Sequence, residues 1–226
     1  MSKHLLHDLE ALERGLLSLG GLAEEAVRRA IASLVGRSDS LAVQVIHGDE
    51  AIDRAEVALE EECLKALALH QPVASDLRFI AACIKITSDL ERIGDLAVNI
   101  AERAASLSRE NPLAAPPNLE AMTEKVTAML RNCLDAFVQG DVPAAWSVMA
   151  MDDEVDALHS TVMGDMLGLM KCEPEQVDDA MLFLSTSRHL ERIADHATNI
   201  AEDVVYMVEG TIVRHGRRLP EGTGQG

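Results

Sequence analysis

Residues 90–102 read LERIGDLAVNIAE, and residues 190–202 read LERIADHATNIAE. The two stretches differ only at their fifth, seventh and ninth positions, and they are offset by 100 residues throughout. A second pair, DEAID at 49–53 and DDEVD at 152–156, recurs in the same order at an offset of 103 residues. Two motifs repeated in the same order at nearly the same offset indicate that the chain contains two copies of one structural unit.

Between these motifs, apolar residues recur every three or four positions, and the helix-forming residues Ala, Leu, Glu and Arg dominate. This pattern predicts long helices and almost no strand. Pro72, Pro143 and Pro174 stand where new helices are expected to start, because the first turn of a helix tolerates proline. We expect helices at about 5–36, 40–70, 73–109, 118–139, 142–170 and 174–209.

The segment 111–117 contains three prolines, which cannot continue a helix, so it is expected to link the two copies. The sequence therefore predicts an all-α protein of two tandem three-helix bundles, with six long antiparallel helices related by internal duplication. The first bundle is expected over residues 1–110 and the second over residues 118–210. The Gly-rich end, 211–226, has no periodicity and is expected to be disordered.

The amino-acid composition argues against some classes of binding partner. The chain has 226 residues, with 20 Lys and Arg against 38 Asp and Glu, a net charge of -18 that argues against nucleic acid and anionic lipid. No stretch is long and apolar enough to span a membrane, which makes the cytosol the expected location. The four cysteines form no CxxC pair and are interpreted as small buried hydrophobes. Met163, Met166 and Met170 are interpreted as core residues.

Acidic side chains gather on one face of each motif helix. At about 100° per residue, the polar residues of each motif fall within a stripe about 80° wide, opposite the apolar residues. The helix before each motif carries a similar stripe. In the first copy the candidate metal ligands are Glu91, Asp95, Asn99 and Glu102 with Asp49, Asp53 and Glu56, followed by Glu60. In the second they are Glu191, Asp195, Asn199 and Glu202 with Asp152, Asp156 and His159, followed by Met163.

Two interpretations of these stripes are open. Like-charged neighbours one helical turn apart repel each other by roughly 0.2–0.5 kcal/mol per pair, and a bound cation would remove that cost. Oxygen-rich sets suit Mg²⁺, Mn²⁺, Ca²⁺ or Fe, and the imidazole of His159 favours Fe or Zn in the second copy. The alternative is that the stripes are solvated faces. The two copies agree on Glu, Asp, Asn and Glu at all four motif positions, which favours a site.

The duplicated LERI[GA]DxAxNIAE helix, the DxxxD pair on the preceding helix and Asp76-Leu77-Arg78 together resemble the PhoU family of bacterial phosphate-signalling regulators. The resemblance covers about residues 7–209 and implies a pair of three-helix bundles. It also implies multinuclear iron or zinc clusters at the E(D)xxxD motifs. Those motifs map onto Glu91 with Asp95, Glu191 with Asp195, Asp49 with Asp53, and Asp152 with Asp156.

The resemblance further implies a role in restraining phosphate uptake and repressing the phosphate-starvation response. Members link the ATPase subunit of the phosphate ABC transporter to a sensor histidine kinase, and they often form homodimers. The second copy departs from the family pattern where Gln176-Val177-Asp178 replaces Asp-Leu-Arg, and where His159 and Met163 enter the stripe. These departures predict that the two sites are not equivalent.

Taken with the resemblance, the sequence predicts a cytoplasmic, non-enzymatic, metal-binding regulator, with Fe or Zn preferred and Mn or Mg possible as the bound ion. No Gly-rich phosphate loop, nucleophile elbow or triad is found in the sequence. One alternative is a ferritin-like di-iron carboxylate protein, although Asp156-Ala157-Leu158-His159 is the one near match to its Glu-x-x-His pairs. The other is a metal-free helical adaptor whose acidic face docks a basic protein.

Overall fold

The computed structural model describes residues 3–107, 112–214 and 217–218. Within them, helices make up nearly all of the chain, with one short antiparallel strand pair, Val213–Arg214 (β1) with Arg217–Arg218 (β2). The helices are α1 (Lys3–Val35), α2 (Asp39–His70), α3 (Ser75–Ser106), α4 (Pro117–Gln139), α5 (Val142–Cys172) and α6 (Val177–Glu209), with a short 3-10 turn, η1 (Pro174–Gln176), before α6.

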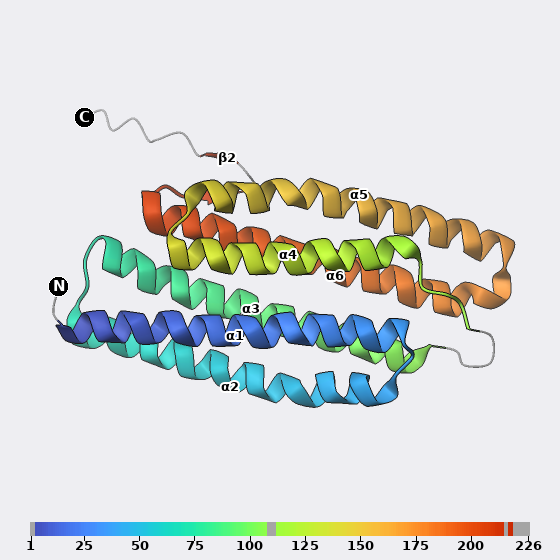
Figure 1. The fold of residues 1–226 in the computed structure, drawn as a ribbon, viewed down its shortest axis with the longest axis horizontal. Helices are drawn as coiled ribbons and strands as arrows, with labels where there is room; N and C mark the ends of the chain where they lie inside the picture. Colours follow the sequence, from blue (N-terminus) through green and yellow to red (C-terminus); the bar gives the residue numbers. More distant parts are fainter. Residues whose placement is uncertain (1–2, 108–111, 215–216, 219–226) are drawn as a thin grey trace.

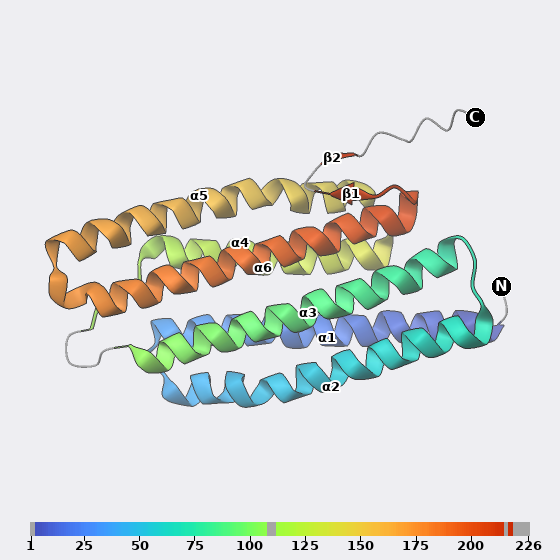
Figure 2. The same cartoon turned by 180° about the vertical axis from the view of Figure 1, so that it is seen from behind.

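The helices form two antiparallel three-helix bundles, α1 to α3 and α4 to α6, that lie side by side along their length (Figure 1). Helix α3 packs along α6 and α1 packs along α4, so these four helices join the bundles. Helices α2 and α5 lie on the two outer edges, as Figure 2 shows from behind. The predicted all-α fold of two duplicated three-helix units is confirmed.

Local signals in the sequence set most helix ends. The Oγ of Ser38 and the carboxylate of Asp141 accept backbone N–H groups at the starts of α2 and α5, which satisfies donors that have no partner within the helix. Gly140 ends α4 with a positive φ of 60°, a conformation that glycine adopts without strain. Helix α3 starts at Ser75 rather than at 73, because Ala74 has a φ of 51° and cannot belong to the helix.

The cores consist of aliphatic side chains on the inward stripe of each helix. Ile86, Ile93 and Ile100 follow one another every seven residues along α3 and are fully buried. The corresponding face of α6 buries Ile193 and Ile200 in the same way. Each such side chain contributes roughly 1.5–3 kcal/mol by leaving water, so these stripes hold the motif helices in fixed orientation.

Three expectations about individual residues are wrong. Cys172 is exposed at the end of α5, where the last turn turns it away from the bundle, whereas the other cysteines are buried as predicted. Met163 is 41% exposed although Met166 is buried, because α5 has neighbours on one side only. Val213 is 3% exposed and packs against the core, so the chain end is not disordered at this position. Residues 215–216 and 219–226 of the predicted disordered tail lie outside the described residues.

None of the described helices is long and apolar enough to cross a lipid bilayer.

Candidate metal centres

The first acidic cluster lies between α2 and α3 and consists of Asp49, Asp53, Glu56, Glu91 and Asp95. Burial raises the pKa of Asp49 to about 6, and the neighbouring charges of Asp53 and Asp95 add to the shift. Burial also raises the pKa of Glu91, with further contributions from Asp95, Glu56 and Asp53. Carboxylates of two helices thus lie near one another in partly dehydrated surroundings.

A glycine brings the two helices of this cluster close together. A Cβ placed on Gly94 would lie 3.0 Å from Cδ1 of Ile52 and 3.1 Å from Oδ1 of Asp49. A methyl group at position 94 would require the side chains of Ile52 and Asp49 to give way by a few tenths of an ångström at the middle of the cluster. The second copy has Ala194 at this position, so its two helices accommodate a methyl group there.

The guanidinium of Arg92 offsets part of the negative charge of the first cluster. Nη1 of Arg92 lies 3.2 Å from Oδ2 of Asp95, and its Nε lies 3.4 Å from Oε2 of Glu91. The Arg92 side chain is 60% exposed, so this pairing is screened by water and is weak. Burial and the negative charges of Glu60 and Asp53 raise the pKa of Glu56. The positive charge of Arg92 opposes this rise.

The predicted ligands at the end of the first stripe lie apart from this cluster. Nδ2 of Asn99 donates to the backbone oxygen of Asp95 at 2.8 Å, which directs the amide along its own helix. Glu102 is one turn further on, with its Oε2 4.0 Å from Nη1 of Arg103. Neither residue is among the groups that shift the pKa of Asp49 or Glu91.

The second acidic cluster lies between α5 and α6 and consists of Asp152, Asp153, Asp156, Glu191 and Asp195. Burial is the main cause that raises the pKa of Asp152 to about 6. The negative charges of Asp195, Asp156, Asp153 and Glu191 add to the shift. Burial and Asp156 likewise raise the pKa of Asp195. The pattern of the first cluster is thus reproduced by the second copy.

A pocket of about 620 Å³ opens on the second cluster. Asn199 and Glu202 line it beside Asp152 and Asp195, so in this copy three of the four predicted motif residues border one space. Thr198 also lines this pocket, and its Oγ1 is buried with no hydrogen-bond partner among the described residues. Sequence reasoning missed Thr198, because a threonine on a helix gives no pattern that marks a polar group without a partner.

His159 lies at the far end of the second stripe and borders a separate pocket of about 520 Å³. Its Nδ1 lies 3.0 Å from Oγ of Ser187, and that hydroxyl donates its own proton to the carbonyl oxygen of Leu184 at 2.9 Å. Glu191 borders the same pocket and is the one member of the second cluster there. His159 was predicted to share a stripe with the carboxylates of the second copy. In the structure, Glu191 is the one carboxylate of the second cluster that borders the pocket of His159.

The donor sets fit hard or borderline cations chemically, since both clusters present several oxygens whose mutual repulsion a cation would relieve. Among the described residues, no three His, Cys, Asp or Glu side chains are already grouped as a metal site. Binding would therefore require the carboxylates to rotate on their fixed helices. Asp49, Asp53, Glu91 and Asp95 would hold an ion in the first bundle, and Asp152, Asp156, Glu191 and Asp195 in the second.

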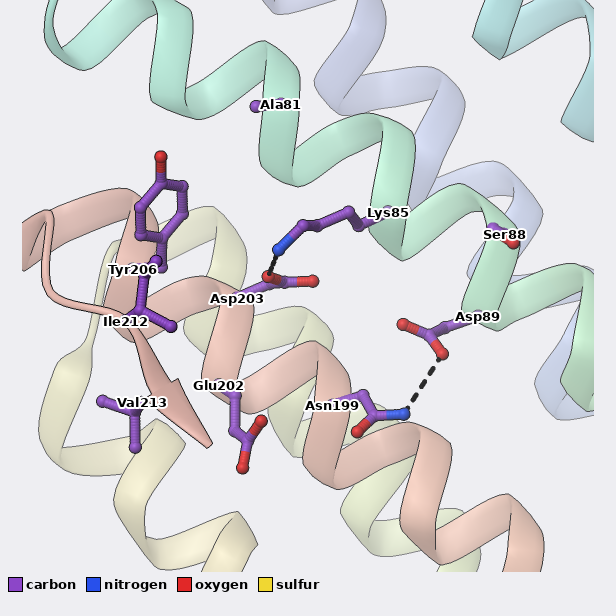
Figure 3. Close-up of a pocket in the computed structure, with 10 residues that line it drawn as sticks. All are labelled: Ala81, Lys85, Ser88, Asp89, Asn199, Glu202, Asp203, Tyr206, Ile212 and Val213. Atoms are coloured by element: carbon purple, nitrogen blue, oxygen red, sulfur yellow. Dashed lines mark hydrogen bonds and ion pairs between the residues drawn. The ribbon is translucent and has the colours of Figure 1, made fainter. Parts of the chain in front are cut away.

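A third polar region, which sequence reasoning did not find, joins the two bundles. Figure 3 shows a pocket of about 600 Å³ between α3 and α6, where Nζ of Lys85 lies 2.6 Å from Oδ1 of Asp203. Asp89 reaches Nδ1 of His196 at 2.7 Å and Nδ2 of Asn199 at 3.5 Å. These residues are more than 100 positions apart in the chain, so helical periodicity could not pair them.

The duplication extends to this interface. At the offset of 100, Lys85 corresponds to Ser185 and Asp203 corresponds to Arg103. The contact between Lys85 and Asp203 has a counterpart, because Nε of Arg103 donates to Oγ of Ser185 at 3.4 Å. The two bundles are thus related by an approximate twofold axis between α3 and α6. His189 stands at the position that Asp89 occupies in the first copy. Burial lowers the pKa of the His189 imidazole to about 4, and the positive charge of Arg103 is the next largest cause. His189 and His196 belong to neither cluster, and His196 pairs with Asp89 across the bundle interface.

Fold and site together define a class: a duplicated helical bundle protein with an acidic cluster between two helices of each bundle. The PhoU domain model matches this chain twice, over residues 16–104 and 119–204. The chain belongs to the PhoU family.

Relatives of known name agree with this assignment. The protein from Aquifex aeolicus is 40% identical over 211 residues, which cover 93% of this chain and 96% of the relative. The protein from Pseudomonas aeruginosa is 38% identical over 95% of this chain and 89% of the relative. Both are named phosphate-specific transport system accessory protein PhoU homolog.

Two crystal structures have the same fold. PhoU from Pseudomonas aeruginosa matches with a TM-score of 0.85 and 38% identity, over 91% of this chain and 99% of that one. The phosphate transport system regulatory protein PhoU from Streptococcus pneumoniae matches with a TM-score of 0.88 and 33% identity, over 93% of this chain and 99% of that one.

Proposed function

We propose that this chain is an accessory regulator of a phosphate-specific transport system. The observation that carries the proposal is the similarity along nearly the whole chain to proteins named as accessory to that system. In this role the protein acts in the cytoplasm and restrains phosphate uptake. It contacts the ATPase subunit of the phosphate ABC transporter and a sensor histidine kinase, and so represses the phosphate-starvation response.

The two acidic clusters are proposed to bind metal ions, with Fe or Zn preferred and Mn or Mg as alternatives. Support comes from carboxylates of two helices that lie near one another in each bundle, and from the repetition of this arrangement in both copies. Binding of a cation would tie α2 to α3 and α5 to α6. Since α2 and α5 are the outer helices, the ions would control the shape of the surfaces that partners reach first.

The site favours a regulator over a ferritin-like oxidase. In that enzyme class, carboxylates and histidines from four helices point into the core of one bundle. Here each cluster lies between two helices, and Asp95 keeps 42% of its side chain exposed. We therefore propose a non-enzymatic role.

A metal-free adaptor is the second candidate, and one observation favours it: no three acidic, histidine or cysteine side chains are grouped as a metal site in the described part of the chain. In that case the clusters dock a basic surface of the partner directly. A second copy of the chain is a further proposed partner, and Val57 and Leu64 are exposed apolar residues on α2 that such a contact could cover.

Co-purification with the transporter ATPase subunit, with and without a chelator, tests these proposals. The regulator proposal predicts a complex, and the metal proposal predicts that the chelator releases it. Retention of the complex in chelator supports the metal-free adaptor. Failure to form any complex with that subunit, together with unchanged phosphate uptake in a deletion strain, contradicts the accessory role. Light scattering after size exclusion tests the homodimer.

A further inference from the structure

The pocket beside His159 carries side chains of a different chemical character from the acidic clusters. We call it the methionine pocket; it is lined by His159 and Met163 from α5 and by Met181, Leu184, Ser185, Arg188 and Glu191 from α6. An imidazole and two thioethers therefore border one space of about 520 Å³, with one carboxylate at its edge. These are soft and borderline donors, whereas the acidic clusters offer only hard oxygens.

The hydrogen bonds around His159 leave its second ring nitrogen ready to bind a ligand. Ser187 uses its hydroxyl proton on the carbonyl oxygen of Leu184, so its oxygen accepts the Nδ1–H of His159. In the neutral ring, Nε2 then carries the free lone pair. Histidines that bind metals commonly have the other nitrogen fixed by a hydrogen bond of this kind.

The two thioethers are exposed, which is unusual for methionine in a protein with ample core. Met163 is 41% exposed and Met181 is 51% exposed, so neither serves chiefly as core filler. Met163 follows His159 by four residues, which places the two side chains on one face of α5 about one turn apart. Met181 approaches from α6, and its long unbranched side chain can adjust to a ligand between the helices.

The first bundle provides an internal comparison, because it lacks the imidazole and both thioethers. At the offsets of the two repeats, Glu56, Glu60 and Ala81 stand where His159, Met163 and Met181 stand in the second bundle. The soft donor set is therefore a property of the second copy alone, on the same scaffold.

We propose that the methionine pocket binds a soft monovalent d¹⁰ metal ion, Cu(I), through Nε2 of His159 and the sulfur atoms of Met163 and Met181. Thioether sulfur selects Cu(I) over hard cations. Charge favours the same ion: the three donors are neutral and the carboxylate of Glu191 is offset by the guanidinium of Arg188, so the lining has no net charge to stabilise a divalent ion. The guanidinium of Arg188 repels a divalent ion twice as strongly as a monovalent one. The inference does not rest on the transport role, and Glu191 is the one residue that the pocket shares with the second acidic cluster.

The test measures Cu(I) affinity by anaerobic competition with the chromophoric chelator bicinchoninate. All proteins carry Cys172→Ser, because the exposed thiol at the end of α5 is a competing soft ligand. We expect one Cu(I) per chain, and Met163→Leu, Met181→Leu and His159→Asn are each expected to weaken binding by about 10-fold or more. Both leucine substitutions conserve volume at exposed positions, so the fold is expected to survive.

Two controls make the result specific. Met151→Leu, on α5 but outside the pocket, and Asp152→Asn with Asp195→Asn, in the second acidic cluster, are expected to leave the Cu(I) affinity unchanged. With Ag(I) as a redox-inert substitute, the ¹³C-methyl signals of Met163 and Met181 are expected to shift together in NMR spectra. Loss of Cu(I) to bicinchoninate by the Cys172→Ser protein, or equal affinity in the pocket and control variants, would overturn the proposal.

Discussion

Replacing Asp49 and its counterpart Asp152 by asparagine should stabilise the metal-free protein at neutral pH. Both carboxyl groups have a pKa raised from 3.8 to about 6, mainly by burial. An acid with a raised pKa binds its proton more tightly in the folded state. Its contribution to stability is therefore full at low pH and is lost as the pH rises through about 4 to 6. Above that range, each ionised carboxylate opposes folding.

The magnitude follows from the shift. About 2 pH units correspond to about 3 kcal/mol for each group, and partial exposure to water reduces this to about 1–2 kcal/mol. The two groups are in different bundles, so their effects should add. We expect Asp49→Asn with Asp152→Asn to raise the free energy of unfolding by about 2–4 kcal/mol at pH 7.5, and by about half as much at pH 5.0.

Urea denaturation in the presence of EDTA, at both pH values, measures the effect. Glu50→Gln with Glu62→Gln is the matched control, because it removes two charges from exposed positions of α2. The control is expected to change the free energy of unfolding by less than about 0.5 kcal/mol at either pH. Equal stabilisation by the test variant at pH 7.5 and 5.0, or destabilisation at pH 7.5, would refute the reasoning.

Further predictions concern the core, the bundle interface and the ions. Ile93→Ala should lower the free energy of unfolding by about 2–5 kcal/mol in urea denaturation, because the side chain is fully buried. Lys85→Ala should cost about 1–3 kcal/mol because it leaves the buried Asp203 without its cation, whereas Lys65→Ala, which breaks the exposed pair with Glu62, should cost less than about 1 kcal/mol. Calorimetry of the metal-free protein should show a higher Tm after addition of Mn²⁺ or Zn²⁺ at pH 7.5, and a smaller rise in the Asp49→Asn with Asp152→Asn variant.

The fold could be predicted from the sequence because its signals are local and repeated. Apolar residues every three to four positions place the helices, and Pro143 marks a helix start that the structure confirms. The start of α3 was harder to locate, because the backbone turn at Ala74 has no glycine or asparagine to announce a positive φ. Burial of Val213 was missed for a related reason: one apolar residue in a Gly-rich end has no periodicity to detect.

The composition of the candidate site could be predicted better than its arrangement. A helical wheel places Glu91 and Asp95 on one face, but the pairing of that face with Asp49 depends on which helix packs beside it. The same limit applies to the Lys85–Asp203 pair, which exists only because α3 packs on α6. It also applies to Met163, whose exposure follows from the outer position of α5 rather than from its own spacing.

The central claim is that the two acidic clusters bind metal ions. The most direct test is the metal content of protein purified without chelators, measured by inductively coupled plasma mass spectrometry. Wild type is compared with Glu91→Ala/Asp95→Ala and Glu191→Ala/Asp195→Ala, and with Glu50→Ala/Glu62→Ala as a control of equal charge. The account predicts stoichiometric Fe, Zn or Mn that falls in each cluster variant and stays constant in the control. Absence of stoichiometric metal from wild type, or equal content in all four proteins, would contradict it.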